Sequence, residues 1–276
     1  MTARESRANR PGPPCVVTIA ASDSGGGAGV AADLLTFAAH EVFGALVLTA
    51  VTAQNTKSVV AIGRVPARMI GKQMDAVFPD LRPAAVKIGM LGDSSQVEAV
   101  ARGLRRHRAR RVVLDPVLIS KSGARLLSKR GVQTVKRRLL PLCDLVTPNL
   151  PEAEALSGVR IRSLADRWLA AGVIADLGAR AVLIKGGHGQ GRTVRDLLFD
   201  GSTLTVFSAR RIRTSPAHGT GCTLSSAIAA NLARGSGLHE SVELAIAYLR
   251  SALETGFFPG SGFAVLDHSP VIRARS

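Results

Sequence analysis

Strand-sized apolar segments alternate with helix-sized segments along most of this 276-residue chain. The predicted strands, such as residues 16–20, are apolar throughout and do not alternate between polar and apolar positions. Strands of this kind are typical of a parallel sheet, because the helices that connect parallel strands cover both of its faces. The alternation therefore predicts an α/β fold with a mostly parallel central sheet and helices on both faces.

The periodicity also sets approximate element boundaries. The predicted strands are residues 16–20, 46–53, 84–88, 111–114, 145–147 and 181–185, followed by a hairpin of residues 194–198 and 204–208. The predicted helices are residues 28–39, 67–78, 95–107, 129–140, 164–177, 222–233 and 241–255. No change in composition marks an internal boundary. We therefore expect one domain over residues 15–268, with a flexible Arg/Pro-rich tail at 1–14 and a short tail at 269–276.

Hydropathy and cysteine usage indicate a cytoplasmic protein. The chain is 46% hydrophobic, yet no apolar run approaches the roughly 18 residues that a membrane-spanning helix needs. The basic, proline-containing start argues against a secretory signal. The three cysteines lie far apart without a Cys-x-x-Cys pair, which favours reduced thiols and argues against structural zinc.

The formal charge of +16 invites a nucleic-acid interpretation. The two basic clusters, residues 105–111 and 129–138, fall at predicted helix ends, where basic side chains suit the helix dipole. Aromatic residues are only 4% of the chain and do not interleave with these clusters. A nucleic-acid partner is therefore not favoured, and a phosphate-rich small substrate would equally benefit from a positive field.

Polar residues and glycines follow most of the predicted strands. In open α/β sheets, ligands bind at the carboxyl ends of the strands. The segments at those positions are residues 22–29, 54–56, 89–91, 115–117, 148–152 and 186–188. We therefore expect an active site along this edge of the sheet.

Several common catalytic templates are absent from the sequence. The glycine loop at residues 25–29 is not G-x-G-x-x-G, because Val30 occupies the last position, and it lacks the Lys-Ser/Thr of a P-loop. The chain also has no G-x-S-x-G elbow, no H-E-x-x-H and no protein-kinase signature. These absences disfavour a nicotinamide dehydrogenase, an α/β-hydrolase, a zinc protease and a protein kinase.

The most informative segment contains Gly219, Thr220, Gly221 and Cys222, directly before a long apolar helix. Free N–H groups and the positive end of the helix dipole make such a start an anion site, and these amides would stabilise a transferring phosphoryl group. A thiol at this position is expected to have a lowered pKa and could accept a proton from an attacking hydroxyl. The alternatives are an ordinary glycine-rich helix start and a small buried thiol.

Five other polar residues follow predicted strands or the glycine loop. Asp115 and Glu152 could position Mg²⁺, although Asp115 could instead begin a turn and Glu152 could occupy the first turn of a helix. Lys185 ends an apolar strand, where its ammonium group could reach a phosphate or simply be solvated. Asp33 could bond a polar group of a ligand. Gln54 both donates and accepts hydrogen bonds, which suits the edge of a heterocycle.

Taken together, these segments resemble the hydroxymethylpyrimidine/phosphomethylpyrimidine kinases of thiamine biosynthesis, members of the ribokinase-like superfamily. The resemblance covers roughly residues 16–268 and rests on seven segments that occur in the family's order. They are TIAASD with GGAG (18–23 and 26–29), TAQNT (52–56), KIGML (87–91), DPV (115–117), TPNLPEAE (147–154), KGGH (185–188) and HGTGC (218–222).

The resemblance implies that ATP phosphorylates 4-amino-5-hydroxymethyl-2-methylpyrimidine, and that a second ATP converts the monophosphate to the diphosphate. In the family, the residue that matches Gln54 binds the aminopyrimidine, with help from those that match Asp33, Met90 and Val117. Ala21 replaces a usual glycine beside the pyrimidine, which narrows the pocket by one methyl group.

For the phosphate end, the resemblance makes residues 219–222 an anion hole whose cysteine stands where sugar-kinase relatives carry an aspartate base. Residues that match Asp115 and Glu152 serve Mg²⁺, and those that match Asn149 and Lys185 serve the nucleotide phosphates. The family is usually dimeric, so the resemblance implies a homodimer.

The sequence departs from the family pattern at several positions. Ser24-Gly25 replaces Pro-Ser, Ala31 replaces glutamine, Ala124 replaces an acidic residue, and Ile246 stands where many members carry a lysine near the nucleotide. Two alternative functions stay open. One is a pyridoxal or pyridoxine kinase of the same superfamily. The other is a pyrimidine- or nucleic-acid-binding protein with reduced catalysis, which Ile246 and the positive charge suggest.

Overall fold

The computed structural model describes residues 12–118, 126–187, 191–212 and 217–269. Within them, eight strands form the main sheet, and six neighbouring strands of it run parallel to one another, as the sequence predicts. The antiparallel pair β9–β10 is the predicted hairpin. In order across the sheet, the strands are β10 (Leu204–Arg210), β9 (Thr193–Phe199), β8 (Val182–Ile184), β7 (Leu145–Val146), β6 (Val112–Leu114), β5 (Ala85–Ile88), β1 (Cys15–Ala20) and β2 (Phe43–Leu48).

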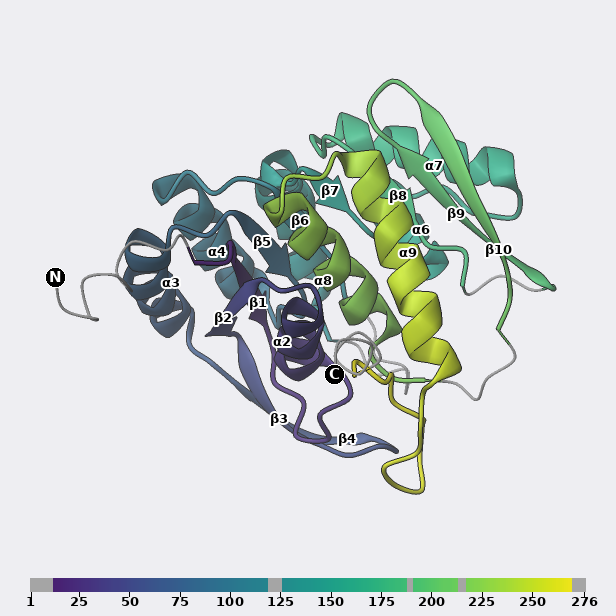
Figure 1. Ribbon diagram of the computed structural model, residues 1–276. Coiled ribbons are helices and arrows are strands. Elements are labelled where there is room, and N and C mark those ends of the chain that lie inside the picture. The colour runs from purple at the N-terminus through teal and green to yellow at the C-terminus, as the bar shows by residue number, and fades with distance from the viewer. Residues whose placement is uncertain (1–11, 119–125, 188–190, 213–216, 270–276) are drawn as a thin grey trace, which may run out of the picture.

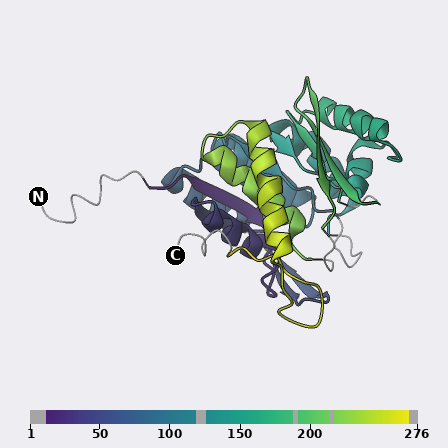
Figure 2. The same cartoon turned by 45° about the vertical axis from the view of Figure 1, so that its right-hand side comes forward.

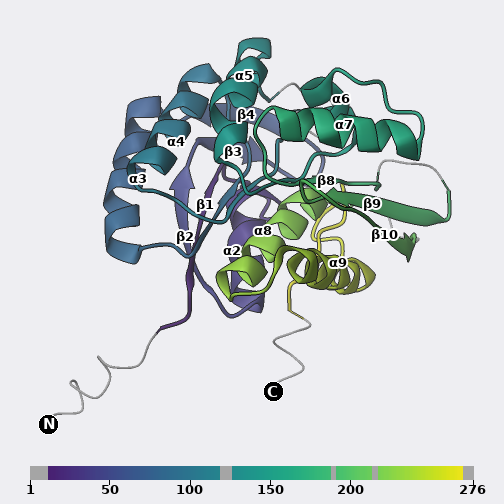
Figure 3. The ribbon, with the colours of Figure 1, turned by 90° about the horizontal axis from the view of Figure 1, so that it is seen from above.

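Helices cover both faces of this sheet, which confirms the predicted fold class (Figure 3). One layer contains α3 (Ala67–Leu81), α4 (Ser94–Arg106), α5 (Lys129–Thr134), α6 (Leu150–Ser157) and α7 (Leu164–Asp176). The other contains α2 (Gly29–Ala39), α8 (Thr220–Ala233) and α9 (Leu238–Glu254).

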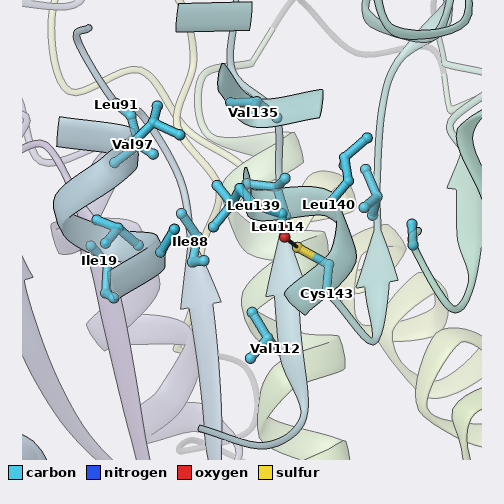
Figure 4. Close-up of a cluster of buried hydrophobic side chains, with 14 of the residues drawn as sticks. Ile19, Ile88, Leu91, Val97, Val112, Leu114, Val135, Leu139, Leu140 and Cys143 are labelled. Atoms are coloured by element: carbon cyan, nitrogen blue, oxygen red, sulfur yellow. Dashed lines mark hydrogen bonds between the residues drawn. The ribbon is translucent and has the colours of Figure 1, made fainter. Parts of the chain in front are cut away.

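The apolar strands supply a separate core to each helix layer. Along β6, Val112 and Leu114 face the α3–α7 layer, whereas Val113 between them faces α8 and α9. Figure 4 shows the first of these cores, in which Leu114 lies close to Leu139 from the segment after α5. Burying one such aliphatic side chain contributes about 1.5–3 kcal/mol. Both faces of each central strand are therefore buried, so a binding site has to form at the ends of the strands.

The prediction of one strand over residues 46–53 is wrong. The chain leaves the main sheet at Thr49, whose N–H donates to the carbonyl of Ala20 and whose hydroxyl donates to the carbonyl of Met90. Residues beyond it form β3 (Ala50–Gln54), which pairs with β4 (Val59–Arg64) in a separate two-stranded ribbon. The sequence analysis missed β4 because most of its residues are exposed and it shows no alternation of polar and apolar residues.

Two further elements differ from the sequence prediction. Helix α5 does not continue to residue 140, but passes into a π-helical segment (Val135–Leu139) and a 3₁₀ turn (Leu140–Leu142) that contains Pro141. Helix α6 was not predicted as a helix, although Glu152 was placed in the first turn of one as an alternative. Asn149 and Glu152 form a capping box at its start, so that alternative is confirmed.

The β3–β4 ribbon lies beside the loop that follows α9 (Figures 1 and 2). The N–H groups of Gly262 and Phe263 in that loop donate to Thr56 at the tip of the ribbon. In the described part of the chain, no helix is long and apolar enough to cross a membrane. Most of the predicted tails, together with Ala124 and His188, lie outside the described residues.

Candidate active site

A cavity of about 840 Å³ lies at the carboxyl ends of the parallel strands. Its wall includes residues that follow β1, β5 and β6, the start of α8, and the β3–β4 ribbon. The volume is in the range of small-molecule sites. Of the predicted site residues, these line the cavity: Ala21, Gln54, Met90, Asp115, Val117, Asn149, Glu152, Lys185, Gly219, Thr220, Gly221 and Cys222. The sequence-based choice of this sheet edge therefore brings together every predicted site residue except Asp33.

The start of α8 is fixed against the glycine loop. Gly219 caps the helix at a φ of 79°, in the left-handed region that favours glycine, and a Cβ there would overlap the carbonyl oxygen of Gly27. The Thr223 N–H donates to the Gly219 carbonyl at 2.8 Å, which leaves the three preceding amides at the open end of the helix. No side chain caps this end. The arrangement suits an anion in the cavity.

An ion pair lies directly beside these amides. Lys185 Nζ is 2.6 Å from Asp115 Oδ1, and the two side chains are 14% and 4% exposed. A Cβ on Gly221 would lie 3.2 Å from Lys185 Nζ and 3.1 Å from Asp115 Oδ2. Burial alone would lower the pKa of Lys185, but the carboxylates of Asp115 and Glu152 raise it above its ordinary value. Lys185 is therefore a permanent cation next to the helix start.

Glu152 is the second carboxylate of this corner. Its Oε2 accepts the Asn149 N–H at 2.8 Å, while the Asn149 side chain accepts the Glu152 N–H at 3.0 Å. Burial raises the pKa of Glu152 to about 7; the charge of Asp115 adds to the increase, and Lys185 opposes it. Glu152 therefore changes charge near neutral pH.

The surroundings of Cys222 contradict the expectation of a lowered thiol pKa. Burial raises the pKa of Cys222 to about 11, and the carboxylates of Asp33 and Asp115 add to the increase. Lys87 and a hydrogen bond with the Gly29 backbone oppose it but do not prevail. The helix dipole is too weak to offset the loss of water around the sulfur, so the thiol is neutral at neutral pH.

Asp33 is the predicted site residue that does not line the cavity. It is fully buried and accepts hydrogen bonds from Thr18 Oγ1 at 2.6 Å and Ser226 Oγ at 2.7 Å. Lys87 Nζ lies 2.8 Å from both of its carboxylate oxygens. The carboxylate is thus occupied in this structure, and the Lys87 ammonium stands between it and the cavity that Lys87 lines.

Sequence reasoning missed Lys87 as a site residue. Burial alone would lower its pKa, but the charge of Asp33 outweighs this effect and raises it. The available signal was a lone lysine in the otherwise apolar strand β5, AVKI. A buried lysine needs a carboxylate partner, and the chain places Asp33 of α2 opposite it.

The other predicted pyrimidine contacts line the same cavity. The Ser24 hydroxyl donates to the Gln54 carbonyl at 2.6 Å and accepts the Gln54 N–H at 2.7 Å, which joins the glycine loop to the ribbon. The carbonyl of Met90 accepts the Thr49 hydroxyl. Val117 N–H donates to the carbonyl of Asp115 at 2.9 Å. Backbone contacts therefore fix these three predicted substrate residues in place.

Helix α9 contributes Ile246, Leu249, Arg250 and Leu253 to the wall of the cavity. Ile246 thus lies in the wall where the family resemblance places a lysine. Arg250, one turn later, lines the same cavity and donates to the carbonyl of Arg210 at 2.7 Å. A cation at Arg250 was not predicted from the sequence. The available signal was its position four residues after Ile246, which places the two side chains on the same face of the helix.

The chemistry of the donors permits a magnesium ion. The described residues contain no cluster of three or more His, Cys, Asp or Glu side chains that could hold a metal. Mg²⁺, however, usually binds through one or two carboxylates together with substrate phosphates and water. Asp115 and Glu152 both line the cavity, and their repulsion contributes to the raised pKa of Glu152. A divalent cation between them would relieve that repulsion.

Comparison with known proteins identifies the family. A family model described as phosphomethylpyrimidine kinase matches residues 23–267. A hydroxymethylpyrimidine/phosphomethylpyrimidine kinase of Rhizobium meliloti is 51% identical over 238 residues, covering 86% of this chain and 89% of the relative. Its counterpart in Bacillus subtilis is 45% identical over 253 residues, covering 91% and 93%.

Solved structures agree with the fold. The pyridoxal kinase of Staphylococcus aureus in complex with AMP-PCP has a TM-score of 0.88 at 33% identity, covering 95% of this chain and 96% of that chain. The fold is ribokinase-like, as the sequence resemblance implies. With a family model that spans most of its length and two relatives above 40% identity, the chain belongs to the phosphomethylpyrimidine kinase family.

Proposed function

We propose that the protein is an ATP-dependent kinase that phosphorylates 4-amino-5-hydroxymethyl-2-methylpyrimidine and then its monophosphate. The observation that carries this proposal is the corner formed by residues 219–222, Lys185 and Asp115, which meets the predicted pyrimidine contacts in one cavity. Family membership supports the same activity. ATP and a pyrimidine of this size would have to be neighbours in such a cavity for direct transfer.

In this mechanism, Gln54, Met90 and Val117 orient the ring so that its hydroxymethyl oxygen points to the α8 start. The amides of residues 220–222 and the Lys185 ammonium stabilise the charge that develops on the transferring phosphoryl group. Asn149 supports the nucleotide phosphates from the start of α6. Mg²⁺, held by Asp115 and Glu152, would supply further charge neutralisation on the phosphates.

We propose that Cys222 accepts the hydroxyl proton late in the transfer. Phosphoryl transfer passes through a loose transition state, so early proton removal is not required. The raised pKa of Cys222 means that only a small fraction is thiolate at pH 7. A base role therefore makes the rate increase with pH toward the pKa of the thiol.

The activity is tested by incubating the purified protein with MgATP and hydroxymethylpyrimidine and identifying the products by mass spectrometry. We expect the monophosphate first and the diphosphate later. A matched control is Lys72→Met, which removes a lysine from the exposed side of α3. An absence of both phosphorylated products with the folded wild-type protein would overturn the proposal.

A pyridoxal kinase activity is the second candidate, because solved pyridoxal kinases share this fold at 32–33% identity. Pyridoxal and hydroxymethylpyrimidine each present a hydroxymethyl group on an aromatic heterocycle. Competition between the two substrates in one reaction decides between them. We expect a higher kcat/KM for the pyrimidine, and the opposite preference would favour the pyridoxal kinase.

We also propose a cytoplasmic homodimer. ATP and the pyrimidine substrate are cytoplasmic metabolites, which supports the location. Val51, Val60 and Ile62 on the β3–β4 ribbon are exposed apolar side chains that a second copy could cover. Light scattering coupled to size exclusion measures the mass, and a monomer at micromolar concentration would contradict the dimer.

A further inference from the structure

A second cavity, of about 250 Å³, lies at the opposite edge of the sheet from the candidate active site. Its wall contains Ala84, which precedes β5, and Arg111, which precedes β6. The same two strands end at Ile88 and Leu114, directly before the residues that line the candidate active site. The two cavities are therefore separated by the length of β5 and β6.

Among the residues that the structure describes, four arginines and one histidine line this small cavity, and no carboxylate does. The full lining is Phe78, Arg82, Pro83, Ala84, His107, Arg108, Ala109, Arg110 and Arg111. In the described part of the chain, none of the four arginines forms an ion pair. Arg111 donates only a long hydrogen bond of 3.4 Å to the carbonyl of Ala84. Four exposed guanidinium groups therefore surround one concave surface without neutralisation.

The helix dipole suits Arg82, which is the C-cap residue of α3, but it does not account for the other three arginines. Helix α4 ends at Arg106, so Arg108, Arg110 and Arg111 lie beyond its last turn. Arg82, Arg108 and Arg111 adopt φ values of 46°, 49° and 52°, which L side chains rarely do. Glycine or asparagine would fit such positions with less strain.

The floor of the cavity is formed by packed side chains. Phe78 is buried and stacks on the His107 ring at a centroid distance of 5.3 Å, and His107 Nε2 is 2.9 Å from Asp75 Oδ1. The sequence around these residues is also basic, because residues 67–142 hold 17 of the 36 Lys and Arg residues but only 5 of the 20 Asp and Glu residues. A packed floor below several guanidinium groups matches a phosphate, which arginine binds through paired N–H groups.

We propose that this basic pocket, formed by Arg82, Arg108, Arg110 and Arg111 around His107, is a second anion site that binds a phosphate-bearing small molecule. The site is independent of the candidate active site and of the proposed kinase activity. Its ligand contacts are guanidinium N–H groups, and no Mg²⁺ is needed, because no carboxylate lines the pocket.

The test uses inorganic pyrophosphate without Mg²⁺, at 150 mM salt, where the diffuse charge of the surface is largely screened. The pocket variant is Arg82→Gly/Arg108→Gly, because glycine adopts the backbone angles of both positions. The control is Arg102→Ala/Arg137→Ala, which removes two exposed charges from the same helix layer outside the pocket. Both variants are made in a Lys185→Met background, so that binding of pyrophosphate at the candidate active site does not mask the pocket.

By calorimetric titration in the Lys185→Met background, we expect saturable binding of pyrophosphate that weakens at least about tenfold when the pocket substitutions are added. It should stay within about twofold when the control substitutions are added instead. Thermal unfolding shows whether the pocket variant folds, and Arg110→Ala replaces it if it does not. No saturable binding in the Lys185→Met background, or equal weakening by the pocket and control substitutions, would each overturn the proposal.

A short DNA duplex, followed by fluorescence anisotropy, distinguishes a free phosphate compound from a nucleic-acid backbone. Duplex binding that weakens only in the pocket variant supports the same phosphate site with a different source of phosphate. Alternatively, the duplex could bind while pyrophosphate does not, with equal weakening of duplex binding in the pocket and control variants. That result would assign the basic layer to nucleic acid and overturn the small-anion site.

Discussion

Two buried ion pairs of the same type, Asp33–Lys87 and Asp115–Lys185, have different surroundings. Asp33 and Lys87 are both fully buried, and two hydroxyl groups complete the hydrogen bonding of the carboxylate. Lys185 is partly exposed to the cavity, and its partner Asp115 repels the nearby Glu152. We call the first pair closed, because both of its side chains are fully buried although Lys87 borders the cavity, and the second pair open, because Lys185 is partly exposed to the cavity.

This difference teaches that burial alone does not identify a functional charge. In the closed pair, the partners of the Asp33 carboxylate all lie inside the protein, so breaking the pair changes mainly stability. An open pair keeps a cation and a carboxylate available for phosphates or a metal. Cys222 lies between the two, since the charges of Lys87, Asp33 and Asp115 all act on its thiol.

The largest effect is expected for the closed pair. Lys87→Met leaves the Asp33 carboxylate uncompensated in the core, which should lower the free energy of unfolding by about 3–5 kcal/mol. The double variant Lys87→Met/Asp33→Asn should recover part of the loss, because neither charge remains. Urea denaturation measures both, with Lys72→Met as an exposed control. A loss below about 1 kcal/mol for Lys87→Met would show that the pair is not closed as described.

For the open pair, Lys185→Met should reduce kcat/KM about 100- to 1000-fold, as expected for the loss of one group that stabilises the transferring charge. The free energy of unfolding should change much less than in Lys87→Met, because Lys185 borders the cavity. Steady-state kinetics with MgATP and the pyrimidine give the first value. Activity within about threefold of wild type would remove Lys185 from the mechanism.

Cys222→Ala removes the thiol and leaves both ion pairs in place, so it tests the role of the thiol alone. We expect kcat to fall about 100-fold while KM changes little, as for removal of a general base. In wild type, log kcat should continue to increase above pH 8, because the pKa of Cys222 is raised to about 11. The alanine variant should lose that increase. Equal pH profiles for the two proteins would exclude the proton-acceptor role.

Substitution of Glu152 tests its electrostatic interaction with the open pair Asp115–Lys185. If the ionised form holds Mg²⁺, kcat/KM should increase through pH 7, where Glu152 titrates, and Glu152→Gln should remove this step at a cost of about tenfold in rate. The sign for stability is opposite. A carboxyl whose folded pKa is raised favours the folded state at low pH, and this contribution is lost as pH rises from about 4.5 to about 7.

Glu152→Gln should therefore flatten the pH dependence of the free energy of unfolding in that interval. Unfolding curves at several pH values provide the measurement. A wild-type protein that gains stability between pH 5 and 7, with no change in slope for the glutamine variant, would contradict the raised pKa.

The smallest effect is expected for Gly221→Ala. The added methyl group would lie just over 3 Å from both Asp115 and Lys185, so the open pair must shift by a few tenths of an ångström. We expect a loss of about three- to tenfold in kcat/KM. Gly172→Ala, in α7 with open space at the Cβ position, is the matched control and should leave the kinetics unchanged. Equal activity in the two variants would mean that the pair tolerates displacement.

Much of this fold follows from local sequence patterns. A strand that is apolar throughout, such as β6, must bury both of its faces, and two helix layers do this. The exposed strand β4 could not be predicted in that way, because its pairing partner β3 and the turn at Thr49 determine it. Helix α6 did carry a local signal in its capping box, which a search for caps finds.

For the candidate site, the sequence predicts residues that the fold brings to one cavity, but it does not predict their electrostatics. The HGTGC segment predicts a helix start at Cys222. The thiol pKa, however, depends on burial and on the carboxylates of Asp33 in α2 and Asp115 directly after β6. Likewise, Asp33 and Lys87 are 54 positions apart, so their contact depends on the packing of α2 against β1 and on the pairing of β1 with β5. Long-range packing of this kind is what motif reading lacks.

The account is tested most directly by rapid-quench measurement of a single turnover with γ-labelled ATP and hydroxymethylpyrimidine. It predicts that the label moves from ATP to the pyrimidine monophosphate in wild type, and at least about 100-fold more slowly in Lys185→Met. Label that stays in ATP or appears only as free phosphate in the wild-type protein would contradict it, as would equal transfer rates in the two proteins.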